Sequence, residues 1–290
     1  METKLNYKRT FLIGLAFLSI CSFWQMYDNI IPLILQNTYH LGETMTGAVM
    51  ALDNVLAIFL LPVFGALSDK VHTKLGRRMP FIVAGTILAV IFMMLLPMID
   101  NAEKARWNTG ESFSNQVIFL AVLFFTLVSM GLYRSPAVAL MPDVTPNHLR
   151  SRANAVINLM GAVGGVYALI MIKVLVGKGE TPDYLPLFAS IAAVMAIAVG
   201  ILVMTIRENK LREEVEKAEA AIAETIEEKA MAEGVEAVGE IEAVGDTGAV
   251  KASDGKKQTG KTEGTKGMPK EVKRSMYFML ASIFLWFTAY

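Results

Sequence analysis

The sequence predicts an all-α membrane protein: a six-helix bundle, followed by a charged linker and the start of a seventh helix. Hydrophobic residues make up 54% of the 290 residues, and the mean hydropathy is +0.45, which is high for a soluble domain. Several apolar stretches are long enough to cross about 30 Å of hydrocarbon, which takes about 20 helical residues. More than half of the charged side chains lie outside these stretches, in residues 207–274.

The predicted spans follow one another along the first two thirds of the chain, at 11–35, 44–67, 79–99, 115–141, 153–176 and 184–206. The first is too long for a signal peptide and no small-residue cleavage site follows it. A seventh apolar run occupies residues 275–290, which reach only about 24 Å as a helix. We therefore expect a bundle over 1–206, a linker over 207–274 and a truncated seventh helix over 275–290.

Lysine and arginine are divided unevenly between the two sides of the predicted bundle. Because positively charged loops stay in the cytoplasm, this bias predicts a cytoplasmic N-terminus. We expect a multi-pass protein of the plasma (inner) membrane. The side with few cations has Lys104, Arg106 and Lys178, and the other side has Lys4, Lys8, Arg9, Lys70, Lys74, Arg77, Arg78, Arg150 and Arg152.

The linker has two parts of different composition. Residues 211–234 are rich in Ala, Glu and Lys, and we expect them to extend helix six. From Gly234 on, the chain is punctuated by glycines and then rich in lysine, which is typical of disordered segments. The basic part, 247–274, either contacts anionic lipid headgroups or is a solvated tether.

Composition and motifs exclude several classes of protein. Cys21 is the single cysteine and cannot form an intrachain disulfide, and the three histidines lie far apart, so neither a structural metal site nor a metal cofactor is expected. A net charge of zero gives no field for binding nucleic acid. The sequence has no phosphate loop or other cofactor motif and no nucleophile–base pair, so we expect no catalytic residues and no enzyme activity.

Opposite charges gather in the loop between predicted spans two and three. Asp69 lies at the inner end of span two, and Arg77 and Arg78 precede span three. A carboxylate and a guanidinium at such a helix-end interface can hold one conformation and release it in another. The alternative is that the cations only keep the loop inside the cell.

Residues 65–82 resemble the cytoplasmic signature of the major facilitator superfamily. The pattern Ser-Asp-Lys-x5-Gly-Arg-Arg-x-Pro-Phe-Ile is similar to the longer form found in sucrose transporters and in glycoside–pentoside–hexuronide:cation symporters. A second stretch over residues 136–155, with Ala-Leu-x-x-Asp-x-Thr and Ala-Asn-Ala, is similar to sucrose transporters. The resemblance covers 11–206 and implies a 3+3 inverted repeat. It also implies a missing second six-helix half and a conformational latch of Gly65, Asp69, Arg77, Arg78, Asp143, Arg150 and Arg152.

Three ionisable residues fall inside predicted spans: Asp28, Asp53 and Arg134. Charges in hydrocarbon are costly, so each is a functional candidate. Spans one and two run in opposite directions and place both carboxylates at similar depths, which predicts an Asp–Arg cluster near the midplane that binds and releases a proton. The alternatives are a pair that only fixes helix packing and, for Asp28, an outer position facing water.

Sugar recognition needs planar hydrogen-bonding groups beside an aromatic face. Predicted span one supplies both kinds of group, and spans two and four add further polar side chains. The aromatic residues of span one are also typical of a helix core or of the membrane interface. The candidate binding residues besides the charged ones are Trp24, Gln25, Tyr27, Asn29, Asn54 and Tyr133.

Two departures from the resembled families bear on the transported species. Sodium-coupled, melibiose-like members have two carboxylates one turn apart in helix two, where alignment on Pro62 puts Ala57 and Leu61. Proton coupling is therefore favoured over sodium. The helix-four arginine of plant sucrose transporters aligns with Val138, whereas Arg134 lies one turn earlier, so the substrate is expected to differ.

The resemblance implies a secondary active transporter that works by alternating access, importing a sugar or glycoside with protons across a lipid bilayer. Two alternatives stay open. One is transport of another solute, such as a drug or a lipid-like molecule. The other is a membrane scaffold or sensor that does not transport, which is favoured if 290 residues is the full length.

Overall fold

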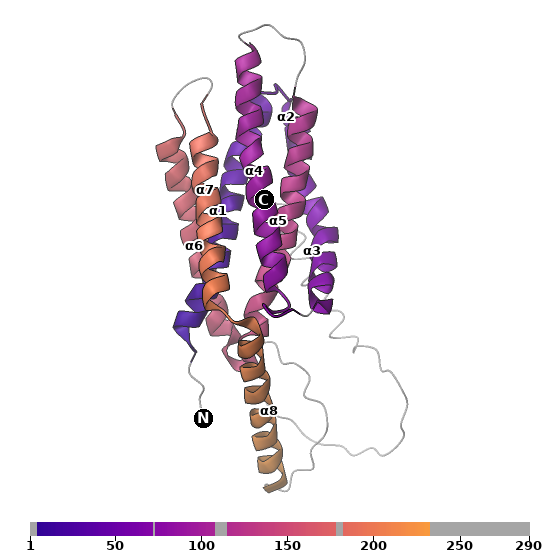
Figure 1. Cartoon of the computed structure of the whole chain (residues 1–290), viewed down its shortest axis with the longest axis vertical. Coiled ribbons are helices and arrows are strands. Elements are labelled where there is room, and N and C mark those ends of the chain that lie inside the picture. The colour runs from indigo at the N-terminus through magenta and orange to yellow at the C-terminus, as the bar shows by residue number, and fades with distance from the viewer. Residues whose placement is uncertain (1–4, 72, 108–114, 178–181, 233–290) are drawn as a thin grey trace, which may run out of the picture. The chain divides into compact units, whose positions relative to one another are not determined.

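The computed structural model describes residues 5–71, 73–107, 115–177 and 182–232, all within one compact unit (Figure 1). These residues form a bundle in which six helical segments are long and apolar enough to cross a membrane. Helices and turns make up the described part, and no strand occurs there. The predicted disordered segment after Gly234 and the predicted seventh span lie outside the described residues.

The described helices follow the predicted order with one break inside span two and one extra helix after span six. Neighbouring spans alternate in direction, so the α3–α4 and α5–α6 connections and α8 lie at the end where α1 begins (Figure 1). We call this end the N-terminal face. The helices are α1 (Tyr7–Asn37), α2 (Glu43–Met50), α3 (Leu52–Lys70), α4 (Met79–Trp107), α5 (Gln116–Asp143), the 3-10 turn η1 (Asn147–Leu149), α6 (Arg150–Leu175), α7 (Leu185–Thr205) and α8 (Glu208–Ala232).

The extra helix corrects one prediction. Residues 211–234 were expected to continue helix six, but α7 ends at Thr205 and Ile206 adopts an extended conformation with φ −98° and ψ 114°. A separate helix, α8, then begins at Glu208. The turn places the buried Glu208 side chain at the start of α4, as described below.

Helix packing in the bundle follows the symmetry of two three-helix repeats. In this symmetry α1 matches α5, the α2–α3 span matches α6, and α4 matches α7. The contact between α1 and α6 then corresponds to the contact between α5 and α3. The α1–α7 contact likewise corresponds to α4–α5, and α4–α7 corresponds to itself. This pattern is what a 3+3 inverted repeat requires.

The tightest crossing joins α1 to α6. A side chain at Gly164 would run into the backbone carbonyl of Leu18, and one at Gly161 would meet the sulfur of Cys21. The Ser22 hydroxyl donates to the Gly164 carbonyl oxygen at 2.9 Å across the same crossing. Small residues are needed here because the two backbones approach closely.

Helices α3 and α6 are among those that present large apolar side chains to the outside of the bundle. None of the most apolar 18-residue window of the α2–α3 span is buried, and α3 exposes Ile58 and Phe59 at 70% and 65%. On α6, Leu159 and Val174 are 65% and 68% exposed. Surfaces of this kind face lipid or another apolar bundle.

Candidate functional site

The central candidate site is a small cavity between α1, α3 and α5. Trp24, Asp53 and Arg134 line it together with apolar residues of α3 and α5, and its free volume is about 20 Å³. The Arg134 guanidinium carbon lies 5.5 Å from the centre of the Trp24 ring, a cation–π geometry. A space of this size holds about one water molecule.

Asp53 lies at the start of α3 because the second span breaks at Ala51. Its carboxylate accepts a hydrogen bond from the Asn54 backbone N–H at 2.7 Å, in the first turn of the helix. The positive end of the helix dipole favours an anion there. Arg134 is near enough to act on this carboxylate electrostatically. The side chain of Asn54 itself is exposed.

The aromatic residues of α1 form a cluster beside this cavity. The rings of Trp24 and Tyr27 meet edge to face, 5.4 Å apart and at 80°. The indole N–H of Trp24 and the hydroxyl of Tyr27 are buried, and neither has a hydrogen-bond partner among the described residues. A buried polar group without a partner costs about 1–3 kcal/mol, so both atoms can gain from a polar ligand or water.

The other candidate binding residues of α1 are two exposed side chains and one half-buried side chain. Asp28 and Asn29 are exposed, and the Asn29 amide donates to the Gln25 backbone carbonyl at 2.7 Å. Asp28 is within electrostatic range of Asp53. Gln25 is half-buried and its side-chain oxygen faces Gly165 on α6. These side chains therefore border the cluster without lining its cavity.

Tyr133 lies apart from the cavity. Its hydroxyl is fully buried, lies 2.6 Å from the Ser19 hydroxyl, and donates to the Ala16 carbonyl at 3.0 Å. These bonds fasten α5 to α1 inside the helix core. The structure therefore does not bring this hydroxyl to the other candidate binding residues.

A second constellation occupies the N-terminal face. The Asp69 carboxylate lies 2.6 Å from Arg78 and 3.5 Å from Arg77, and Asp143 accepts from Arg77 at 2.8 Å and from Arg78 at 2.9 Å. Arg78 is buried and also donates to the Gly65 carbonyl oxygen. Two guanidiniums thus bridge carboxylates at the ends of α3 and α5.

The electrostatics of this cluster keep Arg77 charged. Burial alone would lower the pKa of its guanidinium. The hydrogen bond and charge of Asp143, with the nearby charges of Asp69 and Glu208, raise that pKa above its ordinary value instead. Arg77 therefore keeps its positive charge at every physiological pH, opposite the carboxylates of Asp69 and Asp143.

Two predicted members of the latch are placed elsewhere. Arg150 donates to the carbonyl oxygens of Pro142 at 2.9 Å and Thr145 at 3.2 Å, and so satisfies the C-terminal end of α5. Arg152 is exposed and has no ion pair within the described ranges. Neither guanidinium reaches Asp69 or Asp143.

Glu208 is a functional candidate that sequence reasoning missed. Its carboxylate is 1% exposed and accepts from the backbone N–H groups of Arg77, Arg78 and Met79 at 2.8–3.0 Å, which caps α4. Gly76 precedes these donors with φ +128°, and a side chain there would collide with the carboxylate. The sequence offers one signal for this contact: predicted span three begins directly after Arg77 and Arg78, with no side chain nearby that is typical of a helix cap.

Comparison with known proteins agrees with this geometry. The family model of the major facilitator superfamily matches residues 8–290. Sucrose transport protein SUC4 of Arabidopsis thaliana is 35% identical over 116 residues, which cover 38% of this chain and 22% of the relative. Sucrose transport protein SUT3 of Oryza sativa subsp. japonica is 26% identical over 137 residues, which cover 44% of this chain and 27% of the relative.

These matched segments span about a quarter of the length of the curated relatives. The family match, in contrast, covers nearly the whole chain and coincides with the described bundle. Six membrane-spanning segments, the contact pattern of two three-helix repeats and the Asp–Arg cluster between α3 and α4 all accompany it. The chain is an integral multi-pass membrane protein and belongs to the major facilitator superfamily.

Proposed function

We propose that this chain forms the N-terminal half of a secondary transporter that moves a sugar or glycoside together with protons. The observation that carries the proposal is the grouping of Trp24, Asp53 and Arg134 around one small cavity, which must widen to admit a sugar. An aromatic face, a carboxylate and a guanidinium are the groups that bind a polyhydroxylated ring. The names of the curated relatives, which are sucrose transport proteins, support a sugar as the substrate.

In the proposed mechanism Asp53 binds the proton, with Asp28 as the second candidate. A carboxylate beside a guanidinium changes its protonation when the contact or its access to water changes. Ala57 and Leu61 line the same cavity, so the positions that would supply sodium ligands in related carriers are apolar. Protons are therefore the preferred coupling ion.

The ion pairs of the N-terminal face act as the proposed latch. We place this face in the cytoplasm because the lysine and arginine bias favours that side, and we place the protein in the plasma membrane. Asp69, Arg78 and Asp143 hold α3, α4 and α5 together in one conformation. Releasing them allows the halves to rock about the central site.

A second six-helix half completes the proposed transporter. The apolar faces of α3 and α6 are where it would pack, and it would supply the rest of the binding site. In this scheme residues 1–206 are the first bundle, 207–274 the linker and 275–290 the start of the seventh helix. Reading the coding DNA after codon 290 tests this: we expect an open frame with five further apolar spans, and a stop codon there contradicts the scheme.

Uptake measurements test the substrate and the ion. The complete transporter, reconstituted in liposomes, is given radiolabelled sucrose, maltose or an aryl glucoside under an inward proton gradient, a sodium gradient or neither. We expect at least one sugar to accumulate with the proton gradient alone. Accumulation that requires sodium refutes the proposed coupling, and failure of every sugar refutes the proposed substrate class.

A further inference from the structure

A second basic site lies at the N-terminal face, away from the latch and the central cavity. A cavity of about 440 Å³ opens between the start of α1 and the α7–α8 connection. Four cations line it, Lys8 and Arg9 from α1 and Arg207 and Lys210 from the α7–α8 region. We call these residues the basic pocket. Its volume falls within the range of about 300–1,000 Å³ that is usual for small-ligand sites.

The charges of the basic pocket are poorly compensated. Glu214 is the single carboxylate among its lining residues, and it pairs with Arg9 at 2.8 Å. Lys8, Arg207 and Lys210 are exposed, and none of them forms an ion pair with another residue in the described part of the chain. Four cations facing one carboxylate favour an anionic ligand.

The position of the pocket at the ends of the apolar helices favours a membrane lipid as the anionic ligand. α7 ends at Thr205 and α1 begins at Tyr7, so the cations lie where the apolar helices end. The flanking side chains of Phe11 and Met204 are 51% and 83% exposed and apolar. A headgroup phosphate can therefore meet the cations while its acyl chains run along lipid-facing helix surface.

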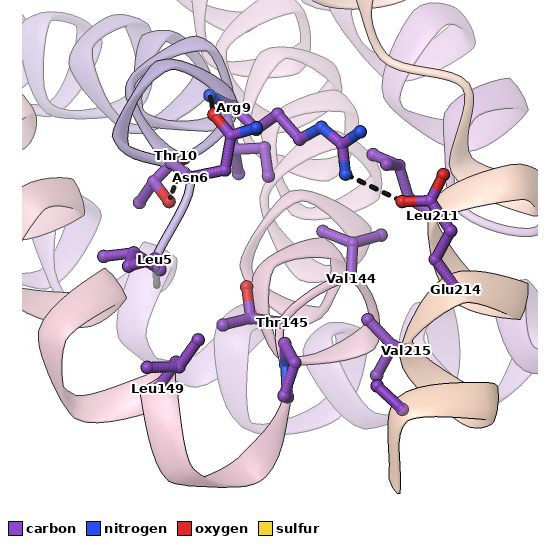
Figure 2. Close-up of a pocket in the computed structure, with 13 residues that line it drawn as sticks. Leu5, Asn6, Arg9, Thr10, Val144, Thr145, Leu149, Leu211, Glu214 and Val215 are labelled. Atoms are coloured by element: carbon purple, nitrogen blue, oxygen red, sulfur yellow. Dashed lines mark hydrogen bonds and ion pairs between the residues drawn. The ribbon is translucent and has the colours of Figure 1, made fainter. Parts of the chain in front are cut away.

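We propose that the basic pocket binds the headgroup of an anionic phospholipid. The ligand would interact most directly with Arg207 and Lys210, which form no ion pair with another described residue, and would compete with Glu214 for Arg9. Arg9 and Glu214 also line a neighbouring cavity of about 180 Å³ between the start of α1, the α5–α6 connection and α8 (Figure 2), so the headgroup binds where α8 docks on the bundle. The inference depends on the bundle spanning a membrane and not on which solute it carries.

Native mass spectrometry of the purified chain in neutral detergent tests the proposal. Dioleoyl phosphatidylglycerol is titrated against dioleoyl phosphatidylcholine, which has the same acyl chains but no net charge. We expect tighter binding of phosphatidylglycerol, and a loss of about 30-fold in its affinity in the double variant R207Q/K210Q. The charge-keeping variant R207K/K210R should bind as the wild type does.

The matched control is R212Q/K217Q, which removes two cations from α8 outside the pocket. It should keep wild-type affinity, and melting temperatures check that each variant is folded. Equal affinity for the two lipids, or an equal loss in the control, overturns the proposal. In a separate titration, inorganic phosphate is added at about 10 mM. Binding of phosphate without any preference for phosphatidylglycerol overturns the assignment to a lipid.

Discussion

The carboxylate of Glu208 satisfies three backbone N–H groups at the start of α4, donated by Arg77, Arg78 and Met79. The first N–H groups of a helix have no partner within the helix, and here those of Arg78 and Met79 are buried together with the acceptor. The same carboxylate adds negative charge beside the two latch arginines. Glu208 therefore supports both the fold and the geometry of the latch.

Replacing Glu208 by alanine should destabilise the protein strongly. The change leaves three backbone donors without this acceptor, two of them buried, and we expect the free energy of unfolding to fall by about 2 kcal/mol. Glu213→Ala on the exposed side of α8 is the control and should change it by less than about 0.5 kcal/mol. Thermal unfolding in detergent compares the two variants, and equal melting temperatures for them would contradict the capping role of Glu208.

Gly76→Ala should also lower stability, for a different reason. Its φ of +128° lies where side chains are rarely tolerated, and a methyl group there would meet the Glu208 carboxylate. We expect a loss of about 1–3 kcal/mol. Gly42→Ala, where no atom lies within 4 Å, serves as the control. The same unfolding assay applies, and a Gly76→Ala protein as stable as its control would contradict this account.

At single residues, a contact within one short loop could be predicted from the sequence, but contacts between distant segments could not. The pairing of Asp69 with the two arginines was predicted, because the charges flank one short loop. Glu208 was missed because it is distant in sequence and its partners are backbone groups, which no side-chain pattern reveals. Tyr133 was a candidate binding residue for its hydrogen-bonding capacity, and in the structure its hydroxyl lies 2.6 Å from the Ser19 hydroxyl in the core. Helical spacing does not determine which neighbour a side chain bonds.

At the scale of elements, the crossing of α1 and α6 depends on Gly164 more than on its neighbour Gly165. A side chain at Gly164 would strike the Leu18 backbone, which cannot move easily, whereas one at Gly165 would touch only the Gln25 side chain at 3.6 Å. We expect Gly164→Ala to lower the melting temperature by several degrees, which corresponds to about 1–3 kcal/mol of overpacking.

Gly165→Ala is the matched control on the same helix. Alanine favours helix more than glycine, so this change should leave the melting temperature unchanged or slightly higher. If both variants lose stability equally, the crossing is not set by the close approach at Gly164. Differential scanning fluorimetry of the two purified variants is sufficient.

Element boundaries were predicted within a few residues where apolar runs end in charged loops, as at Lys70 and Met79. Two breaks were not predicted. The second span is interrupted at Ala51, and α7 stops before α8. The first break puts Asp53 in a first helical turn, and the second brings Glu208 to the backbone N–H groups at the start of α4. Local propensity in the Ala- and Glu-rich segment favoured one continuous helix.

At the scale of the whole molecule, the six-span order and the pseudo-symmetric packing could be predicted from hydropathy and from the signature loop. The composition of the binding site could be predicted only in part. Trp24, Asp53 and Arg134 meet in one cavity, while the exposed Asp28 and Asn29 border it. Side-chain direction on α1 depends on its rotation against α6 and α7, which the sequence pattern leaves undetermined.

Removing the shared acceptor of the latch should slow transport without changing substrate binding. Asp143→Asn weakens the bonds to Arg77 and Arg78 but touches nothing in the central cavity. We expect the maximal uptake rate to change by about tenfold or more and KM to change by less than about threefold. The control Glu216→Gln removes an exposed charge. An unchanged rate in Asp143→Asn contradicts the latch.

The central claim is that Asp53 couples sugar movement to protons at the Trp24–Arg134 cavity. The most direct measurement compares the wild-type transporter with Asp53→Asn in liposomes, for accumulation under an inward proton gradient and for sugar exchange without one. We predict that Asp53→Asn loses accumulation and keeps exchange, because the site still binds sugar but no longer binds a proton. An Asp53→Asn protein that still concentrates sugar against its gradient contradicts the account.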